Sequence, residues 1–414
     1  MTYLLFSGLL IYLLSNYNKG SILILIILPL LEQIPIGSFS VANILVVIIV
    51  LLWLVKSNHK IFEIKNSVFT YGILFMSMSL VLSNIHGAVK HTPTVYLSII
   101  QLLSIYVMID CLNNKTLTNF SIKIITSLSM IFSINGIIET ITHSNPLLNF
   151  GINIGLISND IPIIEEVRFG FKRVQSVFDM HTSWGGYTLL SFCLVFFIIK
   201  YKGYIIKHPF FLLSIIGANC FLTGARSAIL GFVISFIAFI NFDDLIERKN
   251  KKIICILLIL SFLFLDYFQT IISSFQNTDN VDGSNVDMRE NQFEICFFHF
   301  LKSPIYGNGI SYTWEFALPM DKNLNGAESL WIPILIDQGI IGVIAIVTMY
   351  LLAAVYLYKT GNTKFIFVLL GFLVFNTLSS IPHFSIINLI YYIIILASCH
   401  INDEKYDCSI SYNK

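Results

Sequence analysis

The chain consists mostly of long apolar stretches that are separated by short polar turns. A helix needs about 20 apolar residues to cross a bilayer, so this pattern predicts an all-α, polytopic membrane helix bundle with 12–13 transmembrane helices. No fixed-period repeat or low-complexity linker divides it, so a single integral-membrane domain is expected over residues 1–414. The expected spans are 3–15, 21–31, 38–55, 67–85, 94–112, 118–141, 184–200, 209–222, 227–241, 253–268, 329–358, 364–378 and 385–400.

Two long polar loops interrupt the apolar pattern, at residues 143–183 and 271–328. In the second loop, Asp287 and Glu290 have the spacing of a capping box, and Ser303-Pro304 is typical of a helix end. The loop therefore contains an expected helix that lies flat on the membrane or over the bundle, with a tight turn at Gly307 and Gly309 after it. Its predicted apolar face consists of Phe293, Cys296, Phe297, Phe300 and Leu301.

Composition supports the membrane class and excludes several functions. Hydrophobic residues make up 56% of the chain and charged residues 12%, against about 25% charged residues in soluble domains. The net charge of +1 and the lack of a long basic run argue against nucleic acid as a partner. Among seven cysteines only Cys296 falls in an outer loop, so no disulfide framework is expected, and no histidine pair has a zinc spacing.

The distribution of cations predicts the orientation in the membrane, because short cytoplasmic loops carry most lysines and arginines. One orientation leaves only Lys90 and Arg226 in the short loops of the outer side. Both long loops then face outward, and the tail 402–414 faces the cytoplasm. The cations placed at the cytoplasmic ends are Lys56, Lys60, Lys65, Lys115, Lys200, Lys202, Lys207, Arg248, Lys249, Lys251, Lys252, Lys359 and Lys364.

Two arginines stand out at expected helix starts on the outer side. Arg226 opposes the helix dipole there, and outward short loops normally avoid arginine. The free backbone N–H groups of the same helix start, together with a guanidinium, suit a phosphate group. Arg226 could instead reach toward lipid headgroups, and Arg289 could pair with Glu290 or Glu294 on a solvated face.

The remaining candidates come from the first long loop and from the start of a late span. Arg168, Lys172 and Arg173 suit an anionic headgroup, with a solvated face as the alternative, and His181 ends that loop. Glu328 begins the following span, where the helix dipole alone also favours an acid. Asp337 lies inside the same span, so it is expected to be functional or paired within the bundle.

Several of these residues occur in the order found in a known family. Together they resemble the O-antigen ligase and polymerase superfamily over about residues 168–342. The superfamily's ligases usually carry a histidine where this chain has Glu328, which favours a polymerase. The matching pieces are RVQSVF at 173–178, Gly185-Gly186, TGARS at 223–227, Arg289, KSPIYGNG at 302–309, ESL at 328–330 and GIIG at 339–342.

The resemblance implies an enzyme of the bacterial inner membrane that acts on the periplasmic side. Its substrates would be undecaprenyl-diphosphate-linked oligosaccharides, with membrane lipid and a chain-length regulator protein as further partners and no cofactor. In a polymerase, Arg226 and Arg289 would stabilise the departing diphosphate and Glu328 would serve as the general base. The expected substrate-binding residues are Arg168, Lys172, Arg173 and His181.

Three other functions fit parts of the pattern. An O-antigen ligase needs the same donor. A flippase for lipid-linked oligosaccharides also needs many spans and arginines, but it would not need the folded loop 271–328 and would favour internal pseudo-symmetry. A glycosyltransferase that uses a monosaccharide polyprenyl phosphate resembles proteins with a large acidic first outer loop, whereas here the segment after the first span is 16–20.

Overall fold

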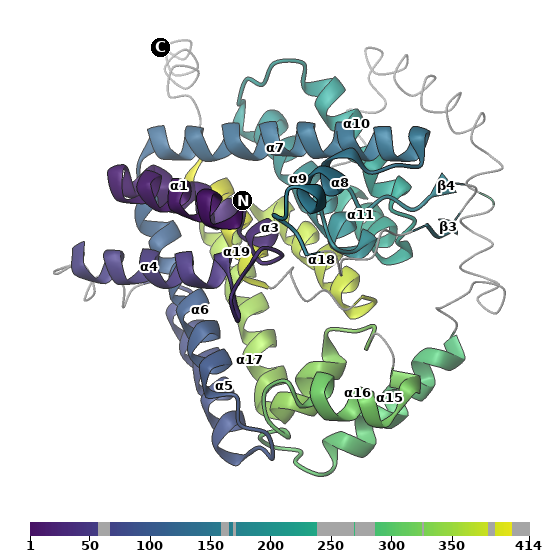
Figure 1. The fold of residues 1–414 in the computed structure, drawn as a ribbon. Helices are drawn as coiled ribbons and strands as arrows, with labels where there is room; N and C mark the ends of the chain where they lie inside the picture. Colours follow the sequence, from purple (N-terminus) through teal and green to yellow (C-terminus); the bar gives the residue numbers. More distant parts are fainter. Residues whose placement is uncertain are drawn as a thin grey trace, which may run out of the picture.

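The computed structural model describes residues 1–56, 67–158, 165–168, 171–237, 269, 286–324, 327–379 and 386–399. These residues form helices apart from two short antiparallel hairpins (Figure 1). The predicted all-α fold class is confirmed. The hairpins pair β1 (Pro35–Ile36) with β2 (Phe39–Ser40) and β3 (Val167–Arg168) with β4 (Phe171–Lys172).

Helices coincide with every expected span except 253–268, which lies outside the described residues. The α-helices are α1 Thr2–Ser15, α2 Tyr17–Ile26, α3 Leu28–Leu31, α4 Val41–Lys56, α5 Thr70–His86, α6 Thr92–Leu112, α7 Lys115–Thr142, α8 Pro146–Asn153, α9 His181–Lys202, α10 Pro209–Leu222, α11 Arg226–Ile237, α15 Val286–Phe300, α16 Leu318–Met320, α17 Trp331–Lys359, α18 Ile366–Thr377 and α19 Ile386–Ser398. Short helices of other types are η3 Thr313–Ala317, η4 Lys322–Leu324 and η5 Thr363–Phe365.

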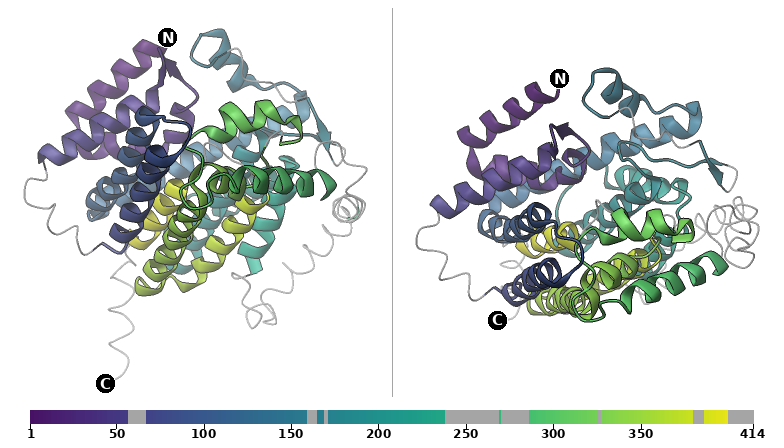
Figure 2. Two further views of the ribbon diagram at one scale, coloured as in Figure 1. Left: turned by 90° about the horizontal axis from the view of Figure 1, so that it is seen from below. Right: turned by 60° about the horizontal axis from the view of Figure 1, so that its bottom comes forward.

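Four helices among the described residues, α6, α7, α9 and α17, are long and apolar enough to cross a membrane. This supports a multi-pass membrane protein. Helices α9 and α19 are buried along almost their whole length, which explains why their sequences are apolar on all sides. Figure 2 shows several helices of the bundle nearly end-on, while α15 crosses one end of it.

The end of α18 lies beside the start of α17, and this contact positions the chain around Glu328. The Leu330 N–H donates to the Asn376 carbonyl (2.9 Å), and the Trp331 Nε1–H donates to the Thr377 hydroxyl (3.0 Å). Helix α18 in turn packs closely along α11, where a Cβ on Gly231 would lie 2.8 Å from a carbonyl oxygen of α18. Small residues allow this close approach of two helices.

Helix α17 is broken at Gly339, which has φ 64° and ψ −157°. The loop after α15 fills the break, and Gly307 (φ 74°) and Gly309 (φ 111°) adopt backbone conformations there that favour glycine. The predicted tight loop therefore supplies hydrogen-bond partners for backbone groups of α17 at its break. Its hydrogen bonds run from Asn308 N to Ile336 O (2.9 Å), from Gly309 N to Asp337 O (3.1 Å) and from Ile340 N to Pro304 O (2.9 Å).

Asp337 is paired within the protein, which is one of the two outcomes expected for an acid inside a span. Its buried carboxylate accepts hydrogen bonds from the backbone N–H of Ser311 (3.1 Å) and of Thr313 (2.7 Å). It also accepts one from the Thr313 hydroxyl (2.6 Å). The acid therefore caps the start of η3 and ties the outer loop to α17.

Helix α15 has nearly the predicted bounds, but its buried face differs from the predicted one. Cys296 is buried and Phe293 partly buried, as predicted, but Gln292 and His299 are buried too, whereas Phe297 is 52% and Leu301 71% exposed. The polar side of the helix turns inward because the loop after it supplies partners. The Tyr312 hydroxyl lies 3.3 Å from the His299 Nδ1, for example. Spacing of apolar residues alone does not reveal such partners.

Candidate functional site

Four of the five arginines in the chain lie at the end of the bundle that carries Glu328. The fifth, Arg248, is outside the described residues. They come from four separate segments, so the fold and not the sequence brings them together. Arg168 is in β3, Arg173 follows β4, Arg226 begins α11 and Arg289 lies in the first turn of α15.

Arg289 and Glu328 form a loose ion pair. The Arg289 Nη2 lies 3.6 Å from the Glu328 Oε2, and the two side chains are 30% and 33% exposed. The same Nη2 donates to the carbonyl of Leu378 after α18 (3.2 Å), and the Glu328 N–H donates to the Gln292 Oε1 (3.3 Å). Such an exposed pair contributes little stability, so both groups can rearrange around a ligand.

The β3–β4 hairpin holds two more arginines against the turn between α10 and α11. The Arg173 Nε donates to the Thr223 carbonyl (3.1 Å), and the Arg168 Nη1 donates to the Gly224 carbonyl (3.3 Å). Glu166 joins the two guanidinium groups, at 3.0 Å from Arg168 and 2.7 Å from Arg173. The hairpin is thereby tied directly beside Arg226.

Gly224 makes this approach possible. It has φ 62°, and a Cβ there would lie 3.3 Å from the Cβ of Arg168 and 3.2 Å from the Cγ of Arg173. A glycine in the TGARS turn is therefore needed both for backbone conformation and for space between two arginine side chains.

Charge interactions link the hairpin to the pair on α15. The charge of Arg226 is opposed by those of Arg168 and Arg289 and favoured by that of Glu328. Burial and the nearby charge of Arg168 lower the pKa of Arg173 to about 10, against the opposite effect of Glu166 and Glu328. Arg173 therefore remains charged near neutral pH. Four guanidinium groups against two carboxylates leave an excess of positive charge, which suits an anionic ligand.

His181, the first residue of α9, lies within the field of Arg168 and Arg173. Its Nδ1 is buried and has no hydrogen-bond partner among the described residues. A buried ring nitrogen without a partner is costly, so this atom is available to a ligand or a bound water. The structure thus places six of the seven candidate residues in or beside one arginine cluster.

Lys172 is the seventh candidate, and its side chain does not face the cluster. Its Nζ donates to the carbonyl of His143 at the end of α7 (2.8 Å), and the side chain is buried. Successive residues of a strand point to opposite faces. Lys172 therefore faces away from the cluster, while Arg173 faces into it.

Sequence reasoning missed Glu166, Gln292 and the Leu378 carbonyl. Glu166 lies two residues before Arg168, and Gln292 lies three after Arg289 on the same helix, so both spacings were visible as pairing signals. The carbonyl carries no sequence signal. In the part of the chain that the structure describes, no three histidine, cysteine or acidic side chains gather as possible metal ligands.

Comparison with known proteins identifies a family for part of the chain. Residues 210–347, roughly a third of the chain, match the family model described as O-antigen ligase. The matched range holds Arg226, Arg289 and Glu328, whereas the β3–β4 hairpin and His181 precede it. No curated protein matches the chain. The match supports the ligase and polymerase superfamily of glycosyl-transferring membrane enzymes, without separating polymerase from ligase.

Proposed function

We propose that this protein is a polymerase of surface polysaccharide that joins undecaprenyl-diphosphate-linked oligosaccharide repeat units. The observation that carries the proposal is the convergence of Arg226 and Arg289 on Glu328, with Arg168 and Arg173 beside them. A transferase with a lipid diphosphate as leaving group needs fixed cations and a proton acceptor in one place. This end of the bundle offers both.

The arginines are the proposed diphosphate site. Each phosphorus of a disubstituted diphosphate carries one negative charge, which matches the excess positive charge of the cluster. Arg226 and Arg289 are assigned to the departing diphosphate because they adjoin Glu328. The planar guanidinium group can form two parallel hydrogen bonds to phosphate oxygens.

The proposed reaction is a displacement at the anomeric carbon of the growing chain. A hydroxyl oxygen of the incoming repeat unit forms the new bond to that carbon, and the bond between the carbon and the diphosphate oxygen breaks. Undecaprenyl diphosphate leaves with the electron pair. The hydroxyl proton passes to the carboxylate of Glu328, and the arginines stabilise the charge that develops on the diphosphate.

The hairpin and His181 are assigned to substrate binding. Arg168 and Arg173 share Glu166 in the absence of substrate, so an incoming phosphate group can replace that carboxylate as their partner. The unpartnered Nδ1 of His181 suits a hydrogen bond to a sugar hydroxyl. The cluster is proposed to face the periplasm, as the cation distribution predicts.

The second candidate is an O-antigen ligase, favoured by the description of the family that residues 210–347 match. A ligase would use the same cations for the same leaving group, and its acceptor would be a lipid core and not a second repeat unit. The carboxylate at 328, where the superfamily's ligases usually carry histidine, favours the polymerase.

Reconstitution separates the candidates. The purified protein in liposomes is supplied with lipid-linked repeat units alone, and products are separated by size. A ladder of multiples of the repeat unit is expected from a polymerase. Absence of a ladder, with transfer only when lipid A core is added, would instead identify a ligase. Loss of the gene should give a single repeat unit on core for a polymerase and bare core for a ligase.

A further inference from the structure

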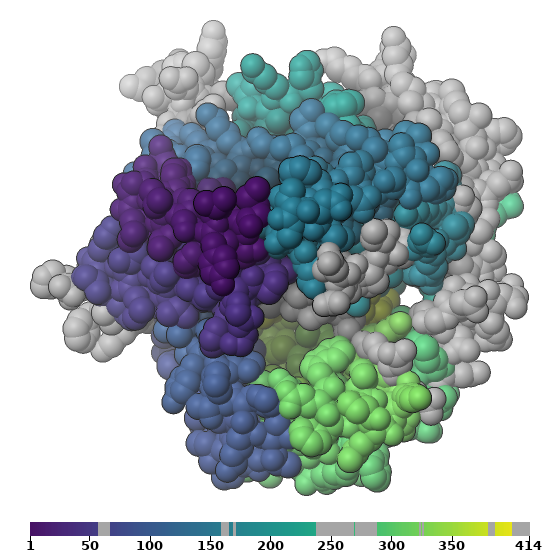
Figure 3. Space-filling view, in the orientation of Figure 1, coloured from purple at the N-terminus to yellow at the C-terminus, as the bar shows by residue number. Residues whose placement is uncertain are grey.

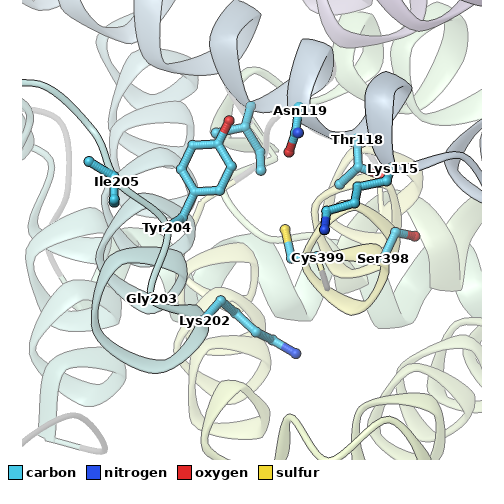
Figure 4. A pocket seen from close by; sticks show the side chains of 10 residues that line it. Lys115, Thr118, Asn119, Lys202, Gly203, Tyr204, Ile205, Ser398 and Cys399 are labelled. Carbon is cyan, nitrogen blue, oxygen red and sulfur yellow. The ribbon is translucent and has the colours of Figure 1, made fainter. Parts of the chain in front are cut away.

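A cavity lies at the far end of α9 from the arginine cluster. Its volume is about 200 Å³, and it is bordered by the start of α7, the end of α9 and the end of α19. Figure 4 shows Tyr204 on one side of the opening, with Lys115 and Ser398 on the other. Helix α9 has 22 residues, about 33 Å at 1.5 Å per residue, so this cavity is distinct from the proposed active site.

The lining of the cavity is cationic and polar. Lys115 and Lys202 both border it, together with Thr118, Asn119 and Tyr204, and among the described residues no acidic side chain lines it. Lys115 is also the first residue of α7, whose first turn has no acidic residue. A lysine at a helix N-terminus adds to the positive end of the helix dipole. A bound anion would therefore be attracted by both the lysine and the dipole.

The surroundings of the cavity favour an anion that carries an apolar chain. Ile122 and Ile205 belong to its lining, and Ile205 is 87% exposed. An apolar side chain that projects at the end of membrane-spanning helices suits contact with acyl chains. Free phosphate gains nothing from contact with an apolar side chain, whereas a phospholipid can place its phosphate between the lysines and its acyl chains along the isoleucines.

We propose that this cavity binds the phosphate headgroup of an anionic phospholipid from the leaflet at this end of the bundle. Lys115 and Lys202 supply the charge, and Asn119 and the Tyr204 hydroxyl supply further hydrogen-bond donors. The inference stands apart from the proposed function, because it uses none of the residues assigned to the polymerase. It adds a structural lipid at the end of α7, α9 and α19.

Native mass spectrometry of the full-length protein in detergent tests the inference. The protein is titrated with dioleoyl phosphatidylglycerol or with dioleoyl phosphatidylcholine, and retained lipid is counted. The parent protein should retain phosphatidylglycerol at least about tenfold more tightly, a difference of about 1.4 kcal/mol. The double variant Lys115→Gln, Lys202→Gln should lose that preference.

The control is Lys207→Gln, which removes an exposed lysine at the same end of the bundle but outside the cavity. It should retain phosphatidylglycerol like the parent. Equal retention of the two lipids by the parent protein would overturn the proposal without any variant. Displacement of phosphatidylglycerol by equimolar inorganic phosphate would also overturn it, since the site would then take free phosphate.

Discussion

Glu328 and a bound diphosphate would compete for the same arginines, and this competition explains how one carboxylate can serve as both an ion-pair partner and a base. Glu328 lies 3.6 Å from Arg289, farther than a strong charge-assisted hydrogen bond of about 2.7–2.9 Å. A diphosphate that binds Arg289 and Arg226 would draw those cations toward its own oxygens. The carboxylate would then be less stabilised and better able to accept a proton from the attacking hydroxyl.

Glu328→Gln tests the role of base. The amide keeps the size of the side chain but cannot accept the proton, so polymer formation in liposomes should fall by about 10²–10⁴-fold. Glu315→Gln is the matched control. Glu315 lies in the same outer loop, but its carboxylate pairs with the His91 ring at a distance of 2.9 Å and not with the arginine cluster. An activity within a few-fold of the parent in Glu328→Gln would remove Glu328 as base and direct attention to His181.

Arg226→Lys and Arg289→Lys test whether the arginines act through their planar geometry. Lysine keeps the charge but loses the paired donors, so each variant should lose about 10²–10³-fold in rate, as for other removed transition-state donors. Arg248→Lys is the control, since the cation pattern places it at the opposite side of the membrane. Chain length and rate close to the parent in both variants would show that charge alone is sufficient.

The outer loop acts as one unit with α17, because Asp337 joins the two. The sequence predicted a helix capped by Asp287 that ends before Ser303-Pro304, and α15 covers Val286–Phe300, with Asp287 inside the helix and not at its N-cap. It could not predict the inward face of α15. Gln292 and His299 are buried because partners from distant segments meet them, and apolar periodicity carries no information on such partners.

Asp337→Ala should destabilise this unit. The change leaves the N–H groups of Ser311 and Thr313 without their acceptor, and a buried donor without a partner costs about 1–3 kcal/mol. The midpoint of thermal unfolding in detergent should therefore fall, and activity should fall with it. Glu290→Ala, an exposed acid on α15, should leave the midpoint unchanged. An unchanged midpoint in Asp337→Ala would refute the structural role of the acid.

The candidate site shows the same limit on what sequence can predict. Arg226, Arg289 and Glu328 were singled out because each begins a predicted helix, and helix starts at one end of a bundle converge. Lys172 and Arg173 look equivalent in the sequence, yet only Arg173 faces the cluster. Their difference depends on the register of β3 with β4, which a pair of two-residue strands does not reveal.

At the scale of the whole molecule, the bundle has two chemically different ends. One end holds the arginine cluster and Glu328, and the other holds the Lys115 and Lys202 cavity. Helix α9 connects them, from His181 to Lys202. The helices agree with the predicted spans, but which end faces the periplasm stays a prediction from the cation distribution.

Cysteine labelling at the two ends of α17 tests that orientation. The helix ends at Lys359, and the roughly 20 residues after its break at Gly339 cover about 30 Å at 1.5 Å per residue, which matches the roughly 30 Å hydrocarbon core, so its ends should lie on opposite sides. Lys322→Cys lies before the helix and Lys359→Cys at its end, and both side chains are exposed. The background is favourable, because the five described cysteines are buried and Cys408→Ser removes the one in the predicted cytoplasmic tail.

In intact spheroplasts, an impermeant maleimide should label Lys322→Cys and leave Lys359→Cys unlabelled until the membrane is opened. The reverse pattern would place the arginine cluster in the cytoplasm, where a polymerase that acts on outward-facing repeat units could not use it. Labelling of both cysteines after permeabilisation is the control for access. The experiment therefore decides whether the arginine cluster faces the side of the membrane on which the proposed reaction must take place.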